Sequence, residues 1–380
     1  MHTRNFGHLD WQASALGFGC MRLPTTDGKP GSAQIDEAEA TRMVRTAIDS
    51  GVNYLDTAYV YHGGQSEVFL GKALSDGYRD KVMVATKLPL WNVQAPEDFD
   101  RLLAEQLERL QTDHIDFYLF HALNLDRWRN VVLKHKLLDK AKQALIDGRI
   151  RHLGFSVHDN YACFAEIIDG SKLWNFCQIQ YNYMDIENQA GIRGLKLAAS
   201  RGLAVIVMEP LLGGRLAEPP RDVQAVMDAH PVRRTPVEWA LEWLWAQPEV
   251  SLVLSGMSNM EQVQDNLRIA DKARIDAFTE ADQELIAQVR KIYQGRTAIP
   301  CTKCNYCMPC PSGVNIPANF DFFNYAHLYD NVPDARFRYG IFVPEIQQAS
   351  ACTECGSCES LCPQNIAIST LMPQVTALLA

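Results

Sequence analysis

Eight short apolar segments recur along the first 275 residues or so, and longer amphipathic stretches separate them. Each segment is nearly continuous rather than alternating and is rich in Val, Ile, Leu, Phe or Tyr, which is typical of a parallel strand buried on both faces. The stretches between them, such as residues 37–51 and 98–111, repeat apolar residues every three or four positions, as amphipathic helices do. The segments are SALGFGCMRL, VNYLDTAY, KVMVATKL, IDFYLFHA, IRHLGFSV, FCQIQYNY, LAVIVMEPL and VSLVLSGM.

Eight strand–helix units in about 270 residues match a (β/α)8 TIM barrel in number and length. A doubly wound α/β sheet is the alternative, but no Gly-x-Gly-x-x-Gly opens a helix after the first strand. Gly51 is a good C-cap signal for the first helix, and Ser66 is a candidate N-cap for the helix over EVFLGKAL. We therefore predict a barrel domain over 1–295, followed by a small, mostly helical domain over 296–380.

Composition excludes several classes of function. A chain of 380 residues with 47% hydrophobic content can bury a large core. Its formal net charge of −9 and lack of a Lys/Arg-rich run argue against a nucleic-acid partner. No apolar stretch approaches the roughly 20 residues of a membrane helix, and the first residues do not resemble a secretion signal. We expect a cytoplasmic protein, in which clustered cysteines stay reduced and are better explained as metal ligands than as disulfides.

Four polar residues stand at the carboxyl ends of predicted strands: Asp56, Tyr61, Lys87 and His121. Each has an ordinary alternative, as a turn cap, a packing residue, a solvated cation or a core histidine. In a (β/α)8 barrel, however, the carboxyl ends of all strands meet at one mouth, where active sites lie. The convergence of all four residues therefore predicts a catalytic site.

The segments GVNYLDTAYVYHGGQSEVFLGKAL, VATK and DFYLFH resemble the aldo-keto reductase family, over roughly residues 10–275. The resemblance implies interconversion of a carbonyl and an alcohol by hydride transfer with NAD(P)H, catalysed by an Asp, Tyr, Lys, His tetrad. Tyr61 would be the general acid in reduction and the general base in oxidation. Lys87 would lower the pKa of the phenol, Asp56 would hold Lys87 charged, and His121 would assist at the same oxygen. His at position 121, rather than Glu, implies C=O rather than C=C chemistry.

The same resemblance implies cofactor contacts along the later strands. Ser156 and Gln178 match residues that contact the nicotinamide carboxamide, and Met208 stands where a side chain packs on the nicotinamide ring. Gly213 and Gly214 would let a loop approach the pyrophosphate, although an ordinary strand-to-helix turn is an equal alternative.

Ser258, Asp265 and Asn266 match the adenosine end of the cofactor site, with solvent exposure as the alternative. No Lys stands near Gly256 and no Arg near Gln262, which favours NADH or dual use, unless Arg268 compensates. The substrate is a small molecule that the sequence does not identify. Cys20, Trp91, Trp128 and Tyr183 are candidate pocket residues, with core or surface packing as the alternative.

Two cysteine runs dominate the last 80 residues. Three thiols at two-residue gaps followed by Cys-Pro are typical of iron–sulfur ligands, and the second run has the full bacterial ferredoxin spacing. Zinc is the alternative, although structural zinc sites prefer two separated cysteine pairs. Eight thiolates fit two [4Fe–4S] clusters. The runs are Cys301, Cys304, Cys307 and Cys310, then Cys352, Cys355, Cys358 and Cys362.

The whole tail resembles the dicluster ferredoxin domain that is fused to some aldo-keto reductases. In two-cluster ferredoxins the last cysteine of each run crosses over, which implies that Cys362 joins the first three thiols and Cys310 joins the second three. Residues 316–331 and 333–342 are predicted to be short helices. The clusters would exchange electrons with a partner protein, or have a structural or redox-sensing role. The alternative for the whole chain is an electron-transfer or nucleotide-binding module whose barrel is a non-catalytic docking platform.

Overall fold

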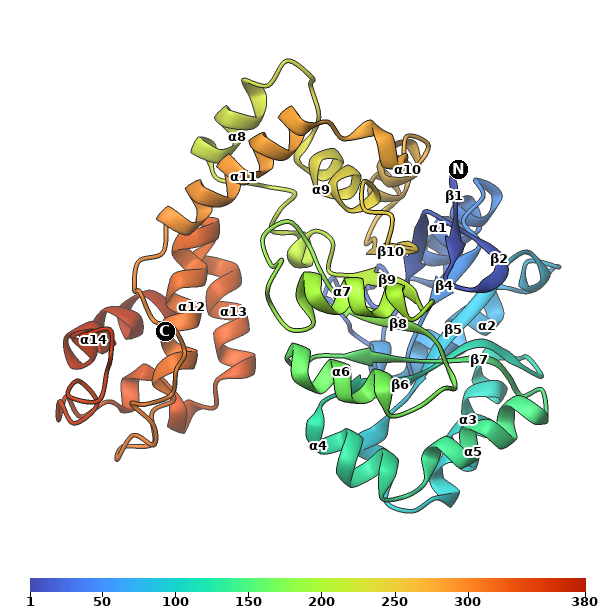
Figure 1. Cartoon of the computed structure of the whole chain (residues 1–380), viewed down its shortest axis with the longest axis horizontal. Helices are drawn as coiled ribbons and strands as arrows, with labels where there is room; N and C mark the ends of the chain where they lie inside the picture. Colours follow the sequence, from blue (N-terminus) through green and yellow to red (C-terminus); the bar gives the residue numbers. More distant parts are fainter. The chain divides into compact units, whose positions relative to one another are not determined.

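In the computed structural model of the chain, which describes residues 1–380, eight parallel strands close into a barrel (Figure 1). Closure occurs where the last strand pairs in parallel with the first, Val253 opposite Leu16. This confirms the predicted (β/α)8 barrel and excludes the open doubly wound sheet. The barrel strands are β3 (Leu16–Gly19), β4 (Tyr54–Asp56), β5 (Met83–Leu88), β6 (Ile115–Leu123), β7 (Ile150–Val157), β8 (Trp174–Gln180), β9 (Ala204–Met208) and β10 (Leu252–Gly256).

Helices surround the barrel, and all of them except the one-turn α4 bury apolar residues against it, forming a continuous core between the two layers. Gly51, with φ 97°, follows the first helix as predicted. Ser66 is not an N-cap: the second helix begins at Gln65, so Ser66 lies in its first turn and is fully buried. The helices are α1 (Glu37–Asp49), α2 (Gln65–Ala73), α3 (Glu97–Leu110), α4 (Leu125–Arg127), α5 (Leu137–Ile146), α6 (Tyr161–Asp169), α7 (Gly191–Ser200), α9 (Pro236–Trp245) and α10 (Met260–Ala270).

A hairpin that the sequence did not predict, β1 (Thr3–Phe6) and β2 (Leu9–Ser14), closes the amino end of the barrel. The ring of Phe6 lies 4.9 Å from that of Phe117 and 6.0 Å from that of Phe176, both inside the barrel. His8 N donates to Gly202 O, just before β9, at 3.0 Å. Because this end is filled, the carboxyl ends of the strands are left as the place for a site.

Short helical turns join these elements and lie within the tail. All are 3-10 helices except η4, which is a π-helix. They are η1 (Tyr61–Gly64), η2 (Arg79–Lys81), η3 (Leu90–Asn92), η4 (Trp128–Leu133), η5 (Leu212–Gly214), η6 (Ile275–Ala277), η7 (Glu345–Gln347) and η8 (Ala349–Ala351).

The chain forms two compact units, 1–216 with 237–280, and 217–236 with 281–380. This differs from the expected boundary at 295/296, because α8 (Arg221–Asp228) and α11 (Glu280–Gly295) belong with the tail. Arg234 pairs with Asp282 at 2.6 Å, and Arg296 pairs with Asp222 at 2.9 Å. These ion pairs join segments that are distant in sequence.

The tail is small and mostly helical, as predicted. Its core is formed by α12 (Ile316–Tyr329), α13 (Val332–Phe342) and an unpredicted α14 (Ile368–Leu379), around Phe320, Tyr339 and Met372. The cysteine runs themselves are turns without strands. Across the chain, the structure has no helix whose length and apolar character would let it cross a membrane.

Candidate active site and cysteine cavities

Lys87 is the centre of a buried polar group at the barrel mouth. Its Nζ donates to Asp56 Oδ1 at 2.5 Å, to the Thr57 carbonyl at 2.7 Å and to Tyr61 Oη at 3.3 Å. Burial acts to lower the pKa of Lys87, but the Asp56 carboxylate and the Tyr61 phenol together raise it above its ordinary value. Lys87 is therefore an ammonium with three acceptors.

Tyr61 follows β4 in a tight turn that directs its phenol toward Lys87. His62, Gly63 and Gly64 all have left-handed backbones, with φ of 52°, 61° and 92°, and the two glycines make this run possible. Burial raises the pKa of Tyr61, and Lys87 offsets this only in part. Lys87 therefore lowers the pKa of the phenol as expected, but burial raises it by more, so the phenol stays protonated at neutral pH.

His121 completes the group from β6. Its ring lies 6.1 Å from the Tyr61 ring at an interplanar angle of 81°, and 5.1 Å from the Trp91 ring. Burial and, to a smaller extent, the Lys87 ammonium hold the pKa of His121 well below its ordinary value, so its imidazole is neutral. Its Nδ1 is buried without a hydrogen-bond partner. The structure thus brings all four predicted catalytic residues to one mouth.

Ser156, Gln178 and Met208 lie on the neighbouring strands β7, β8 and β9. Gln178 Nε2 lies 3.5 Å from Asp56 Oδ2, while its Oε1 is buried with no partner. Ser156 Oγ accepts from Ala122 N at 2.8 Å, which leaves its hydroxyl proton available. An unpaired amide oxygen and a free hydroxyl beside the tetrad suit an amide-bearing ligand such as the nicotinamide carboxamide.

The loop after β9 is open. Gly213 and Gly214 have φ of 73° and 103°, and a Cβ placed on Gly214 would meet no atom within 4 Å. Such a backbone can lie close to a phosphate.

The residues predicted for the adenosine end do not form one cluster, unlike the four predicted catalytic residues. Ser258 and Asp265 are exposed, whereas Asn266 is buried and donates to Ser255 Oγ at 3.1 Å. Arg268 pairs with Glu238 at 3.0 Å, so its charge is already used. Arg22 lies against Gly256 instead, since a Cβ on this glycine would come within 3.2 Å of its Cδ.

Sequence reasoning missed a buried network that supports Lys87. Glu67 Oε1 accepts from Thr86 Oγ1 and from Gln106 Nε2, each at 2.6 Å. Gln106 Nε2 also donates to the Lys87 carbonyl at 3.1 Å. The adjacent Ser66 hydroxyl donates to the Cys20 carbonyl at 3.0 Å.

Ser66 also lies 2.8 Å from Thr57 Oγ1, hydroxyl to hydroxyl. Ser66 and Glu67 together therefore hold the ends of β3, β4 and β5. The available signal was a Ser-Glu pair in the first turn of a helix with an otherwise apolar face, QSEVFLGKAL.

Of the candidate pocket residues, Trp91 alone combines solvent exposure, at 43%, with a position beside His121. Trp128 is buried against Trp174, and Tyr183 against Trp243. Cys20 is fully buried.

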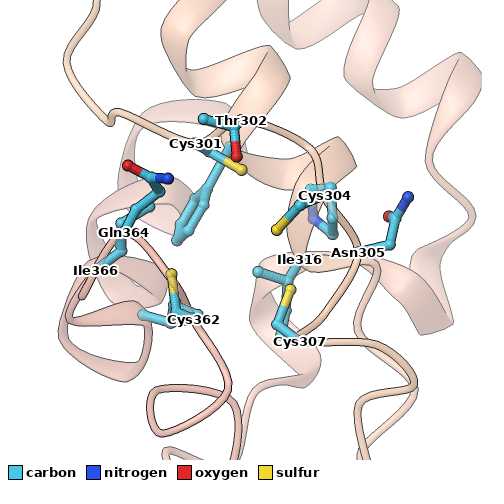
Figure 2. Close-up of a pocket in the computed structure, with 12 residues that line it drawn as sticks. Cys301, Thr302, Cys304, Asn305, Cys307, Ile316, Cys362, Gln364 and Ile366 are labelled. Carbon is cyan, nitrogen blue, oxygen red and sulfur yellow. The ribbon is translucent and has the colours of Figure 1, made fainter.

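Two cavities of similar size lie among the tail cysteines, of about 320 Å³ and 290 Å³ including the solvent at their mouths. The sulfur atoms around the first cavity face its centre (Figure 2). Ile316 and Ile368 line both cavities and so form a shared wall. The first cavity is lined by Cys301, Cys304, Cys307 and Cys362, the second by Cys310, Cys352, Cys355 and Cys358.

The chemistry of these thiols suits a cluster better than a single ion. All eight are free, and four of them line each cavity. Four thiolates are the ligand set of a [4Fe–4S] cluster, and three in succession at two-residue gaps is its spacing, whereas structural zinc sites prefer separated pairs. The residues present therefore fit the implied group.

Comparison with known proteins gives two matches. Residues 15–283 match the Aldo/keto reductase family, and residues 300–367 match a 4Fe-4S dicluster domain. An uncharacterized oxidoreductase, YqkF of Bacillus subtilis, is 25% identical over 72% of this chain and 93% of its own. L-Galactose dehydrogenase of Arabidopsis thaliana is 28% identical over 77% of this chain and 95% of its own.

A solved structure agrees with these matches. Aldo-keto reductase AKR11C1 from Bacillus halodurans, in its holo form, is 26% identical, covers 76% of this chain and 96% of its own, and superimposes with a TM-score of 0.62. The family match covers more than half of the chain, and the tail match spans both cysteine runs. This chain therefore belongs to the aldo/keto reductase family and carries a 4Fe-4S dicluster domain.

Proposed function

We propose that this protein interconverts a carbonyl and an alcohol by hydride transfer with NAD(P)H, with Tyr61 as the general acid and base. The observation that carries the proposal is the buried hydrogen-bond chain from Asp56 through Lys87 to Tyr61, at 2.5 Å and 3.3 Å. Burying an ion pair costs desolvation free energy, and such pairs are therefore more typical of functional sites than of an ordinary core. Here the Lys87 end of the pair contacts a phenol that lies beside a neutral imidazole.

The bound nicotinamide supplies hydride in reduction and accepts it in oxidation. Tyr61 Oη gives its proton to the substrate oxygen as negative charge develops there. The Lys87 ammonium stabilises the phenolate that remains, and Asp56 keeps Lys87 charged. His121, neutral because of its burial, donates a second hydrogen bond to the same oxygen. In oxidation the phenolate of Tyr61 takes the proton back.

The cofactor would lie across the ends of the later strands. Gln178 Oε1 and the Ser156 hydroxyl would bind the carboxamide, and Met208 would pack on the ring. The loop at Gly213 and Gly214 would approach the pyrophosphate.

At the adenosine end we propose Ser258, Asp265 and Asn266. Arg268 is engaged by Glu238, whereas Arg22 brings a cation to Gly256 from another segment. Because charge-assisted contacts select the 2′-phosphate, this arrangement supports dual use of NADH and NADPH.

In the tail we propose two [4Fe–4S] clusters, one in each four-thiol cavity. Bound clusters supply one-electron transfer. The wall shared through Ile316 and Ile368 supports exchange between the sites, and the exposed Cys304 and Cys355 would let a redox partner protein approach. A structural or redox-sensing role is the second possibility. Hydride moves two electrons together, so direct coupling of clusters to the barrel is not part of the proposal. A cytoplasmic location belongs to it, because the thiols must stay reduced.

A non-catalytic barrel, serving as a docking platform or nucleotide-binding module, is the competing function. It would not require a phenol, an ammonium and an imidazole to be held together in a buried site. Turnover separates the two, because a docking module would bind nucleotide and show a reducible cluster signal without converting any carbonyl.

The test is an anaerobic assay with NADH or NADPH against aldehydes, keto acids and sugars, and with NAD⁺ or NADP⁺ against L-galactose in the oxidative direction. Tyr61→Phe should lower kcat by about a hundredfold or more, with nucleotide affinity unchanged. Wild-type reduction should stay constant through neutral pH and fall only above pH 10, because burial raises the pKa of Tyr61 beyond that ordinary value.

Tyr59→Phe is the matched control, because its hydroxyl donates to Glu105, 2.7 Å away, and not to the tetrad. It should keep near wild-type activity. Full activity in Tyr61→Phe would falsify the assignment of the general acid.

A further inference from the structure

Arg127 is a cation without a carboxylate partner at the rim of the active site. Its Nη1 donates to the Ala122 carbonyl at 2.6 Å, and its guanidinium carbon lies 5.3 Å from the centre of the Trp91 ring. None of the ion pairs in the structure includes Arg127. Two residues further on, Arg129 pairs with Glu166 at 2.6 Å.

The absence of a partner is not due to a lack of acids nearby. Asp126 Oδ1 accepts from Asn130 Nδ2 at 2.7 Å, and Asp159 Oδ2 accepts from Leu125 N at 2.9 Å. Both neighbouring carboxylates are thus engaged elsewhere. A guanidinium has five N–H donors, and Arg127 uses one of them on a carbonyl, so a fork of donors stays available.

The position of Arg127 places these donors on the substrate side. Trp91 and Arg127 follow β5 and β6, the strands of Lys87 and His121, whereas the proposed cofactor residues lie on or after β7 to β10. Trp91 contacts both groups: its ring lies 5.1 Å from that of His121 and below the Arg127 guanidinium. An aromatic wall thus leads from the catalytic imidazole to the cation.

We propose that Arg127 binds a carboxylate of the substrate, so that the enzyme acts on carbonyl compounds that also carry an anionic group. This rests on the proposed function, because it deepens the substrate class of the same site. The planar fork of arginine matches a carboxylate with two parallel hydrogen bonds. The cation–π contact with Trp91 holds the guanidinium beside the indole, and the exposed indole offers an apolar surface for the part of the substrate between carbonyl and carboxylate.

The test compares 4-carboxybenzaldehyde with 4-nitrobenzaldehyde, which have similar planar substituents but differ in charge. The ratio of their kcat/KM values is measured in wild type and in Arg127→Met. The ratio should fall about tenfold or more in the variant, mostly through KM, because a charge-assisted pair is lost. Differences in intrinsic reactivity cancel, because both enzymes see the same two aldehydes. Arg127→Lys should recover part of the ratio.

Arg129→Met is the matched control and should leave the ratio unchanged, since Arg129 is occupied by Glu166. Activity of Arg127→Met toward the nitro aldehyde shows that the variant is folded. If that variant does not fold, the wild-type ratio should fall as ionic strength rises, and a ratio independent of salt overturns the inference.

An unchanged ratio in Arg127→Met also overturns the inference while leaving the carbonyl reductase intact. If wild type converts neither these aldehydes nor any other carbonyl tested, the proposed function itself fails, and this inference with it.

Discussion

The barrel mouth and the cysteine tail are built in opposite ways. At the mouth, functional groups bond to one another: the Lys87 ammonium has three protein acceptors within 3.3 Å. In the tail, the thiols make only long contacts, such as 3.5 Å from Cys355 Sγ to Ser357 Oγ. The first site is held together by hydrogen bonds within the protein, whereas the second consists of eight thiols that line two cavities.

The backbone conformations at the two sites also differ. Lys87 and His121 lie within strands, whereas the cysteines lie in turns where Lys303, Asn305 and Glu354 adopt left-handed φ of 55°, 64° and 53°. Non-glycine residues rarely hold such angles without support. We therefore expect the barrel to keep its structure without a ligand, and the tail to depend on its metal for part of its stability.

Metal removal should give the largest contrast between these two regions. Anaerobic treatment with an iron chelator should increase amide hydrogen exchange in α12 and α14 by about a hundredfold or more, because cluster binding energy is folding energy here. Peptides from β6 and β7 should keep their protection, since the barrel core does not depend on metal. Exchange followed by mass spectrometry measures both regions in one sample.

Two controls sharpen this experiment. Iron with sulfide should restore protection in the tail, whereas zinc alone should restore less, because a single ion is smaller than the cube that four thiolates hold at its corners. Unchanged exchange in α12 after complete loss of iron would mean that the apolar core around Phe320, Tyr339 and Met372 is sufficient. The expected dependence of the tail on its metal would then be wrong.

The buried network around Glu67, which supports Lys87, can be weakened without changing a catalytic residue. In Glu67→Gln one carboxylate oxygen becomes an amide nitrogen, which cannot accept the hydrogen bond that Arg109 donates to Glu67 Oε2 at 3.2 Å. The network that holds the Lys87 carbonyl should loosen, and kcat should fall about tenfold with nucleotide affinity unchanged. A shift in the alkaline limb of the pH–rate profile would report the altered pairing of Lys87 with Tyr61.

Glu37→Gln is the matched control for this variant. It makes the same chemical change in a carboxylate that pairs with Lys72 of α2 at 2.9 Å, with both side chains 53% exposed. Exposed pairs contribute little, so activity should stay near wild type. Equal behaviour of the two variants would show that the Glu67 network does not position Lys87.

The sequence predicted the positions in the barrel because polarity begins where each buried strand ends. Asp56, Lys87 and His121 are the polar residues at such ends, and the fold brings them to one mouth. It could not predict the pKa of Tyr61, since the extent of burial depends on segments far away in the chain. It misjudged Ser66 because the left-handed turn at Gly63 and Gly64 starts the helix two residues earlier than the polar pattern suggests.

In the tail, too, local features could be predicted from the sequence, whereas features that depend on distant segments could not. The spacing of the cysteines is a local feature, so the sequence predicted the two runs of thiol ligands. It also predicted the segments that form α12 and α13. The sequence did not predict that α8 and α11 group with the tail. This grouping involves two ion pairs, Arg234 with Asp282 and Arg296 with Asp222, whose partners are 48 and 74 residues apart in the chain.

The smallest expected effect is the most precise test of how the tail is organised. Cys355→Ser should remove one of the two clusters that we propose, so about half of the iron and of the visible absorbance is lost. Cys310→Ser combined with Cys355→Ser should lose no more than that, because both thiols line the same cavity although they belong to different sequence runs. If each run held its own cluster, this double variant would lose nearly all its iron. Cys163→Ser, in α6 of the barrel, is the control and should lose none.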